Sequence, residues 1–127
     1  MIFDFIRNMS QNEIRIEESS VESCLFLRAI KGNKLLGRLN ALFEPDNKAL
    51  LADIDNKNCI NRGVGSKLIE RFEELCKEKG VTEIYGNLAN VDIGHKDRLI
   101  HFYKKHGYTI FEENDQSGYW GKIVKQL

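Results

Sequence analysis

Asn61-Arg62-Gly63-Val64-Gly65-Ser66-Lys67-Leu68 lies between an apolar segment and a segment of helical periodicity, so the elements on either side of it define the fold. Two glycines there let the backbone turn sharply and come close to a ligand without Cβ atoms in the way. The first N–H groups of a helix have no partner inside the helix and lie at the positive end of its dipole. The stretch therefore predicts a strand-to-helix turn whose backbone can hold an anion.

The glycine turn alone leaves more than one interpretation open. Arg62 and Lys67 add positive charge beside it, which favours an anion site, but a Gly-x-Gly sequence is also typical of an ordinary loop before a helix. A P-loop is excluded because no Gly-Lys-Ser/Thr follows, and a dinucleotide-binding turn would need a third glycine. The choice between an anion site and an ordinary loop depends on the surrounding elements.

The chain after the turn predicts two helices that alternate with strands. Apolar residues follow an i, i+1, i+4, i+7, i+8 spacing up to Gly80, which predicts an amphipathic helix. Residues 82–88 predict a strand, and a second helix ends at Gly107, in the position that glycine favours after a helix. Residues 108–112 and 119–124 predict two strands joined by the polar turn 114–118. The apolar positions of the two helices are Leu68, Ile69, Phe72, Leu75 and Cys76, then Leu99, Ile100, Phe102 and Tyr103.

The chain before the turn predicts an antiparallel meander. Ile14 and Ile16 alternate with charged residues, and residues 24–30 form an apolar run ahead of a Gly-Asn hairpin turn at 31–34. A turn built on Pro45 follows the next strand. One face of that strand is predicted to carry Leu35, Gly37, Leu39, Ala41 and Phe43, and the strand after the turn is marked by Leu50, Ala52 and Ile54.

These elements predict a single mixed α+β domain over residues 1–127. A meander followed by strand-helix-strand-helix-hairpin gives a mostly antiparallel sheet with helices packed on it. The helical crossover from the Leu50 strand to the Ile84 strand makes that central pair parallel.

The composition favours a cytoplasmic protein. The 19 basic residues balance 19 acidic ones along the chain, so neither nucleic acid nor a membrane is an expected partner. Cys24, Cys59 and Cys76 have neither disulfide-framework nor zinc spacing, which favours a reducing compartment. The three histidines also lack metal-site spacing, and His101 and His106 are predicted on a helix surface. We therefore expect a cytoplasmic location and no bound metal.

A second segment, Phe102-Tyr103-Lys104-Lys105-His106-Gly107-Tyr108, ends the second predicted helix. Together with the glycine turn it resembles the GNAT superfamily of N-acetyltransferases, whose first motif is Arg/Gln-x-x-Gly-x-Gly/Ala and whose second ends in Phe-Tyr-x-Lys-x-Gly-Phe/Tyr. The resemblance covers about residues 49–113. It implies a GNAT-like twisted mixed sheet with helices on both faces, and acetyl-CoA as co-substrate.

Two departures from the family pattern bear on the expected site. Ile60 stands where the first motif has Arg or Gln, so backbone N–H groups must do most of the binding, with Arg62 as a substitute side chain. The family also has one or two helices between its first two strands, whereas residues 17–23 hold barely a loop. The acceptor site is therefore expected to be open, or to be completed by a partner subunit or by residues 1–12.

The resemblance also implies which residues bind acetyl-CoA. The two amides of pantetheine would pair with the free edge of the Leu50 strand from Ala52 to Asp55, with Ile54 and Asp55 as binding residues, and an N–H near Ile54 would stabilise the oxyanion. The pyrophosphate would lie at the helix start, on Asn61, Arg62, Gly63, Val64, Gly65, Ser66 and Lys67.

Tyr103 is the predicted general acid, because the resemblance places its hydroxyl beside the CoA sulfur and a phenol of pKa about 10 is protonated at neutral pH. A core aromatic residue is the alternative, since Leu99 and Phe102 share its side of the helix. An acceptor amine of pKa about 10.4 also needs a base. The predicted bases are Asp53 and Asp92, with Asp55, Glu44 and His95 as further candidates.

Three functions are compatible with the sequence. The first is direct transfer of an acetyl group from acetyl-CoA to a primary amine of a small molecule or a protein. The second is a non-catalytic CoA-binding module with the same fold, and the third is a structural domain without a CoA site. The C-terminal hairpin, with Tyr119, Trp120 and Ile123, is a candidate homodimer interface.

Overall fold

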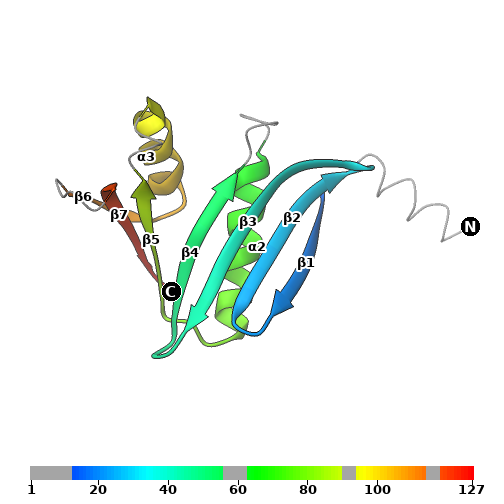
Figure 1. Cartoon of the computed structure of the whole chain (residues 1–127), viewed down its shortest axis with the longest axis horizontal. Coiled ribbons are helices and arrows are strands. Elements are labelled where there is room, and N and C mark those ends of the chain that lie inside the picture. The colour runs from blue at the N-terminus through cyan, green and yellow to red at the C-terminus, as the bar shows by residue number, and fades with distance from the viewer. Residues whose placement is uncertain (1–12, 56–62, 90–93, 114–117) are drawn as a thin grey trace, which may run out of the picture.

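A computed structural model describes residues 13–55, 63–89, 94–113 and 118–127 of the chain (Figure 1). These residues form one sheet of seven strands in the order β1-β2-β3-β4-β5-β7-β6, together with two helices. The strands are β1 (Arg15–Val21), β2 (Cys24–Lys31), β3 (Lys34–Glu44), β4 (Lys48–Asp55), β5 (Glu83–Ala89), β6 (Thr109–Glu112) and β7 (Tyr119–Gln126), and the helices are α2 (Val64–Glu78) and α3 (Lys96–Lys105). Every strand pair is antiparallel except β4–β5, which confirms the predicted mixed α+β fold.

Tight turns join β1 to β4 into the predicted meander. β1 continues to Val21 and is joined to β2 by Glu22 and Ser23 alone. Gly32, with a φ of 61°, lies in the β2–β3 turn, and Asp46, with a φ of 64°, lies in the β3–β4 turn. The prediction that no helix lies between the first two strands is therefore confirmed.

Helix α2 packs its predicted apolar face on the sheet. Leu68, Ile69 and Phe72 are each 0% exposed, and full burial of such a side chain contributes about 1.5–3 kcal/mol. The helix has its C-cap at Lys79, and Gly80 follows with a φ of 78°, a left-handed conformation that glycine adopts without strain. The predicted end of this helix is confirmed.

A β-bulge in the β2–β3 pair overturns one prediction for β3. Leu35 and Gly37 pair with consecutive residues of β2, which leaves Leu36 as the extra residue. Leu36 is 5% exposed and belongs to the core, whereas Leu35 is 36% exposed. If side chains alternated strictly along β3, Leu35 would lie on the same face as Leu39, in the core. The extra residue reverses the alternation, so that Leu35 lies on the opposite face from Leu39.

Both described helices lie on the same face of the sheet, whereas the resemblance implied helices on both faces. Lys125 on β7 donates to the carboxylate of Glu73 in α2 and to the carbonyl oxygen of His106 at the end of α3. Side chains of both helices join one core cluster. Within the described residues the other face carries no helix, because a turn takes the place of the helices that the family has after its first strand. We call this second face the open face.

The C-terminal hairpin contributes to the core. Trp120 is 6% exposed and Ile123 is 1% exposed, so two of the three residues predicted at a dimer interface are buried within the chain itself. Tyr119 remains 41% exposed, and Phe111 on β6 is 51% exposed. The prediction of an apolar interface built on Trp120 and Ile123 is therefore wrong.

Candidate cofactor and catalytic site

The two central parallel strands separate partway along their length. β4 and β5 pair only as far as Leu50, although β4 stays paired with β3 and β5 with β7 beyond that point. At the fork, a Cβ on Gly86 would lie 2.9 Å from the carbonyl oxygen of Leu51, so glycine permits the close approach of the strands there. Figure 1 shows the two strands diverging above this point. Ile54 and Asp55, the predicted pantetheine-binding residues, therefore lie on β4 beside an opening in the sheet.

A second β-bulge turns Asp53 onto the open face. Ala41 of β3 pairs with Leu51 and Asn40 with Asp53, which leaves Ala52 as the extra residue of β4. Leu51 belongs to the core, whereas Asp53 is exposed opposite Asn40. In a regular strand these two side chains, two positions apart, would share a face. The bulge thus separates a core residue from a candidate base beside the opening.

The start of α2 has the geometry that the glycine turn predicted. Gly63 is the N-cap residue, with a φ of 76° and a ψ of 8°, and the first helical hydrogen bond runs from the Lys67 N–H to its carbonyl oxygen at 3.0 Å. The N–H groups of Val64, Gly65 and Ser66 precede that bond, so the helix itself supplies no acceptor for them. No side chain caps this end, and the first turn contains no acidic residue. This helix start can therefore accept an anion on its backbone amides.

The two motif segments meet through one side-chain contact. The hydroxyl oxygen of Ser66, in the first turn of α2, lies 2.9 Å from Nε2 of His106 at the end of α3. Burial lowers the pKa of His106, although the neighbouring Glu70 and Glu73 act to raise it. The imidazole is half-buried rather than on the helix surface, which corrects the prediction from the sequence. The error arose because helical spacing alone gives no sign that α2 lies beside this turn of α3.

Tyr103 is buried near the end of α3, where it is 5% exposed. Its ring makes edge contacts with Phe102, at a centroid distance of 5.3 Å, and with Tyr108, at 5.7 Å. This position agrees with the core-aromatic alternative, and it also places the side chain on the helix that follows β5, on one side of the opening. Its assignment as the acid stays a prediction.

A polar network anchors the end of α3 to α2 and β7. The Tyr108 hydroxyl donates to Glu73 at 2.9 Å, and Lys125 Nζ donates to the same carboxylate at 2.8 Å and to the His106 carbonyl oxygen at 2.7 Å. Burial, with help from Glu73, raises the pKa of Tyr108 and keeps its phenol protonated. The network fixes the backbone next to the Tyr103 side chain. It has no sequence signature, because its members come from three separate elements.

The other predicted site residues are not all brought together. Glu44 accepts a hydrogen bond of 2.6 Å from the Tyr85 hydroxyl at the paired end of β4 and β5, so it does not lie at the opening. That bond raises the pKa of Tyr85 to about 12. His95 is the exposed N-cap residue of α3. Three predicted residues, Asn61, Arg62 and Asp92, lie outside the described residues.

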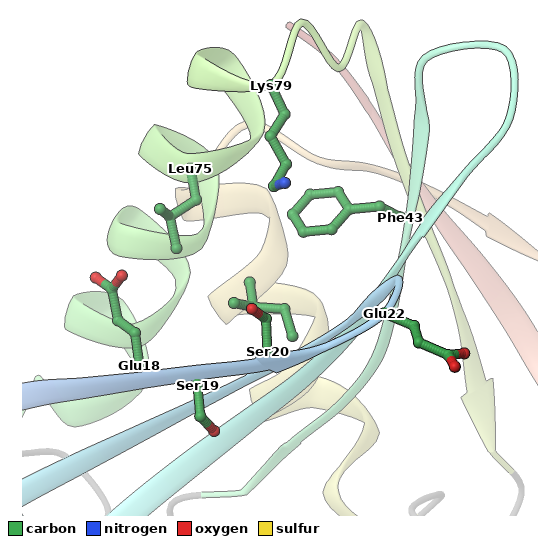
Figure 2. A pocket seen from close by; sticks show the side chains of 8 residues that line it. Glu18, Ser19, Ser20, Glu22, Phe43, Leu75 and Lys79 are labelled. Atoms are coloured by element: carbon green, nitrogen blue, oxygen red, sulfur yellow. The ribbon is translucent and has the colours of Figure 1, made fainter.

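Two hollows mark the described surface away from the glycine turn. One of about 260 Å³ lies between the C-terminal half of α2 and strands β1 to β3, and Figure 2 shows Lys79 extending towards the ring of Phe43 in its wall. It lies at the other end of α2 from Gly63, and we assign it no part in the candidate site. The second, of about 480 Å³, lies on the open face and is lined by Phe26, Arg28, Leu35, Arg38 and Asn40.

Neither a cluster of potential metal ligands nor a membrane-spanning helix occurs in the described residues. Within those ranges there is no group of three or more His, Cys, Asp or Glu side chains placed to hold a metal ion. None of the described helices combines the length and the apolar character that crossing a membrane requires.

Comparison with known sequences finds a match to an acetyltransferase family. Residues 3–108 match the acetyltransferase (GNAT) family. The protein YocC of Bacillus subtilis (strain 168) is 35% identical over 65 residues, which is 50% of this chain and 39% of YocC. YxbD of the same organism is 30% identical over 78 residues, which is 61% of this chain and 45% of YxbD. The chain thus matches less than half the length of either relative.

Solved structures share the fold at low sequence identity. An acetyltransferase from Bacillus subtilis in complex with CoA has a TM-score of 0.71 and 18% identity, covering 91% of this chain and 99% of that one. The IAA acetyltransferase from Bacillus cereus ATCC 14579 has a TM-score of 0.73 and 16% identity, covering 91% and 100%. The PaiA N-acetyltransferase from Thermoplasma acidophilum in complex with coenzyme A has a TM-score of 0.68 and 21% identity, covering 83% and 62%. At these identities the likeness shows the fold.

Proposed function

Because the chain belongs to the acetyltransferase (GNAT) family, we propose that it transfers the acetyl group of acetyl-CoA directly to a primary amine of a small molecule or a protein. The observation that carries the proposal is the opening between β4 and β5 beside the uncapped start of α2. Those two features give a thioester-bearing anionic ligand an extended edge for its amides and a helix end for its phosphates. The complexes of related folds with CoA support the same ligand.

The proposed cofactor contacts are mostly with the backbone. The pyrophosphate of acetyl-CoA would bind the N–H groups of residues 63–66, and the side chains of Asn61, Arg62 and Lys67 would add polar or positive groups there. Ile60 in the motif position is compatible with this, because backbone amides need no guiding side chain. The pantetheine amides would pair with β4 at Ile54 and Asp55, as an added strand pairs with a sheet edge.

The proposed chemistry needs an acid and a base on the two sides of the opening. Nitrogen attacks the thioester carbonyl, the new C–N bond forms, and the C–S bond breaks. An N–H of β4 near Ile54 stabilises the oxyanion, and Tyr103 gives its proton to the departing CoA thiolate. The attacking amine loses a proton to Asp53, directly or through water, with Asp92 as the second candidate. The bulge at Ala52 supports Asp53, because it directs that carboxylate onto the face from which an acceptor has access.

The proposal places this activity in the cytoplasm. Cys24 and Cys76 are free thiols, as expected in a reducing compartment. Burial raises the pKa of Cys76 to about 12, so that thiol is unreactive at neutral pH and no thiol nucleophile is assigned.

Two measurements on the same preparation test the proposal. A ligand that binds only the folded state stabilises it, by about 2.7 kcal/mol at one hundred times its dissociation constant, so acetyl-CoA should raise the melting temperature. Thiol release from acetyl-CoA should then depend on an added amine. Stabilisation without amine-dependent release would favour the non-catalytic CoA-binding module, and absence of stabilisation would reject both.

A further inference from the structure

The proposed transfer chemistry leaves the open-face hollow without a role. Its walls come from β2 and β3, and they contain two arginines, one amide and two apolar side chains: Arg28, Arg38, Asn40, Phe26 and Leu35. In the sequence these residues belong to strands with no motif.

The two arginines are an unusual pair within the sheet. Arg28 on β2 lies directly opposite Arg38 on β3, and like charges in that position destabilise a strand pair. Neither guanidinium makes a hydrogen bond or an ion pair with any residue in the described parts of the chain. By contrast, Arg15 pairs with a glutamate of β1, and Arg71 pairs with glutamates of β1 and α2. An anion between Arg28 and Arg38 would relieve the repulsion.

The hollow adjoins the proposed acceptor side of the opening. Asn40 in its wall pairs with Asp53 across β3 and β4, and Arg38 pairs with Asp55. Neighbouring strands lie about 4.8 Å apart, so Arg38 and Arg28 stand roughly 5 and 10 Å to the side of β4. An amine beside Asp53 can thus belong to the same small molecule as a group bound by the arginines.

We infer that the amine accepted by this site carries a carboxylate, which the guanidinium groups of Arg28 and Arg38 bind in the open-face hollow. The inference rests on the proposed function, since it names the class of acceptor for that reaction. Asn40, which pairs with Asp53, lies on the path from the arginines to that carboxylate, and Phe26, 37% exposed, pairs with Asn40 and lines the same side of the hollow.

The surrounding charges favour a single negative charge in the hollow. The cross-strand row through the arginines reads Glu17, Arg28, Arg38 and Asp55, so a carboxylate flanks the pair on each side. A dianion would be repelled by those flanking groups, whereas one carboxylate accepts hydrogen bonds from the planar forks of two guanidiniums. The acceptor is thus a carboxylate-bearing amine rather than a polyamine or a neutral amine.

Calorimetric titration tests this directly with ε-aminocaproate, whose extended chain spans about one and a half strand spacings. Its amide, ε-aminocaproamide, is the uncharged probe. Both are titrated into the protein with and without CoA, and into the variants Arg28→Gln, Arg38→Gln and Lys34→Gln. Lys34→Gln is the matched control, because this substitution removes one positive charge from β3 at a residue that does not line the hollow.

We expect the carboxylate to bind about tenfold more tightly than the amide, a typical worth of a charge-assisted hydrogen bond. Arg28→Gln and Arg38→Gln should each remove most of that preference and leave amide binding unchanged, while Lys34→Gln keeps it. Equal binding of the two probes, no binding of either, or a preference that survives both arginine changes would overturn the inference. Stabilisation by acetyl-CoA, measured on the same samples, reports separately on the proposed function.

Discussion

The hydroxyl of Ser66 lies 2.9 Å from the imidazole of His106, although forty residues separate them in the chain. Ser66 belongs to the first turn of α2 and His106 to the end of α3, so this contact joins the two segments that carry the family motifs. A substitution of either residue should therefore affect both the start of α2 and the end of α3, on the two sides of the opening between β4 and β5.

The half-buried imidazole of His106 predicts a pH dependence of stability. Burial lowers the pKa of His106 below its ordinary value of 6.5, so the unfolded chain binds a proton at a pH where the folded protein does not. The contribution of the neutral His106 side chain to the unfolding free energy is fully present above about pH 6.5. It is lost as the pH falls towards the lower pKa that His106 has in the folded state. Urea denaturation from about pH 7 to pH 5 should show a decline in unfolding free energy that His106→Gln reduces. His101→Gln, an exposed histidine of the same helix, is the control, and identical profiles for wild type and His106→Gln would contradict the account.

Tyr103→Phe separates catalysis from packing. The change keeps the buried ring and its edge contacts with Phe102 and Tyr108, and removes only the hydroxyl. We expect turnover to fall by about one hundredfold, a typical contribution of general acid–base catalysis, with acetyl-CoA affinity nearly unchanged. Steady-state thiol release and calorimetric binding of CoA measure the two quantities. Unchanged turnover would identify Tyr103 as a core aromatic residue and no more.

Asp53→Asn tests the base on the open face. The amide has almost the same shape but does not accept the amine proton, so turnover at pH 7 should fall and recover partly as the pH rises towards about 10, where the free amine predominates. Asp46→Asn, in the β3–β4 turn far from the opening, serves as the matched loss of charge. A wild-type pH–rate profile for Asp53→Asn would move the role to Asp92 or to water.

The network around Glu73 should hold the end of α3 in place. Glu73→Gln weakens the hydrogen bonds that Glu73 accepts from Tyr108 and Lys125. The side chains of Lys125 and Glu73 are only 23% and 13% exposed, so we expect a loss of about 1–3 kcal/mol in unfolding free energy. Glu83→Gln, which loses a more exposed ion pair with Lys48, should cost less than about 1 kcal/mol. Urea denaturation of the two variants compares them. A larger loss for Glu83→Gln would show that the network contributes little.

The order of the elements could be predicted from sequence because period, turns and helix ends are local properties. Gly80 and Gly107 end their helices as expected, with φ values of 78° and 86°. The bulges at Leu36 and Ala52 could not be predicted, because an extra residue in one strand is defined only by the register of its partner. The consequences were large: one bulge exposes Leu35, and the other turns Asp53 to the open face.

The candidate site likewise has one part that could be predicted from the sequence and another that could not. The glycine turn was predictable, since Gly63 must adopt a positive φ of 76° ahead of a helix that is marked by its apolar spacing. The contact of His106 with Ser66, the network on Glu73 and the paired Arg28 and Arg38 depend on which elements lie side by side. Such neighbours become visible only when the sheet order is known.

The proposed cofactor site can be tested by recording backbone amide chemical shifts with and without acetyl-CoA. If the cofactor lies in the opening between β4 and β5, the largest changes should fall on residues 52–55 and 63–67, with smaller ones at the end of α3. The hollow beside Phe43 and Lys79 at the other end of α2 should stay unchanged. Chemical-shift changes confined to the residues that line that hollow, or no changes at saturating acetyl-CoA, would contradict the proposed cofactor site.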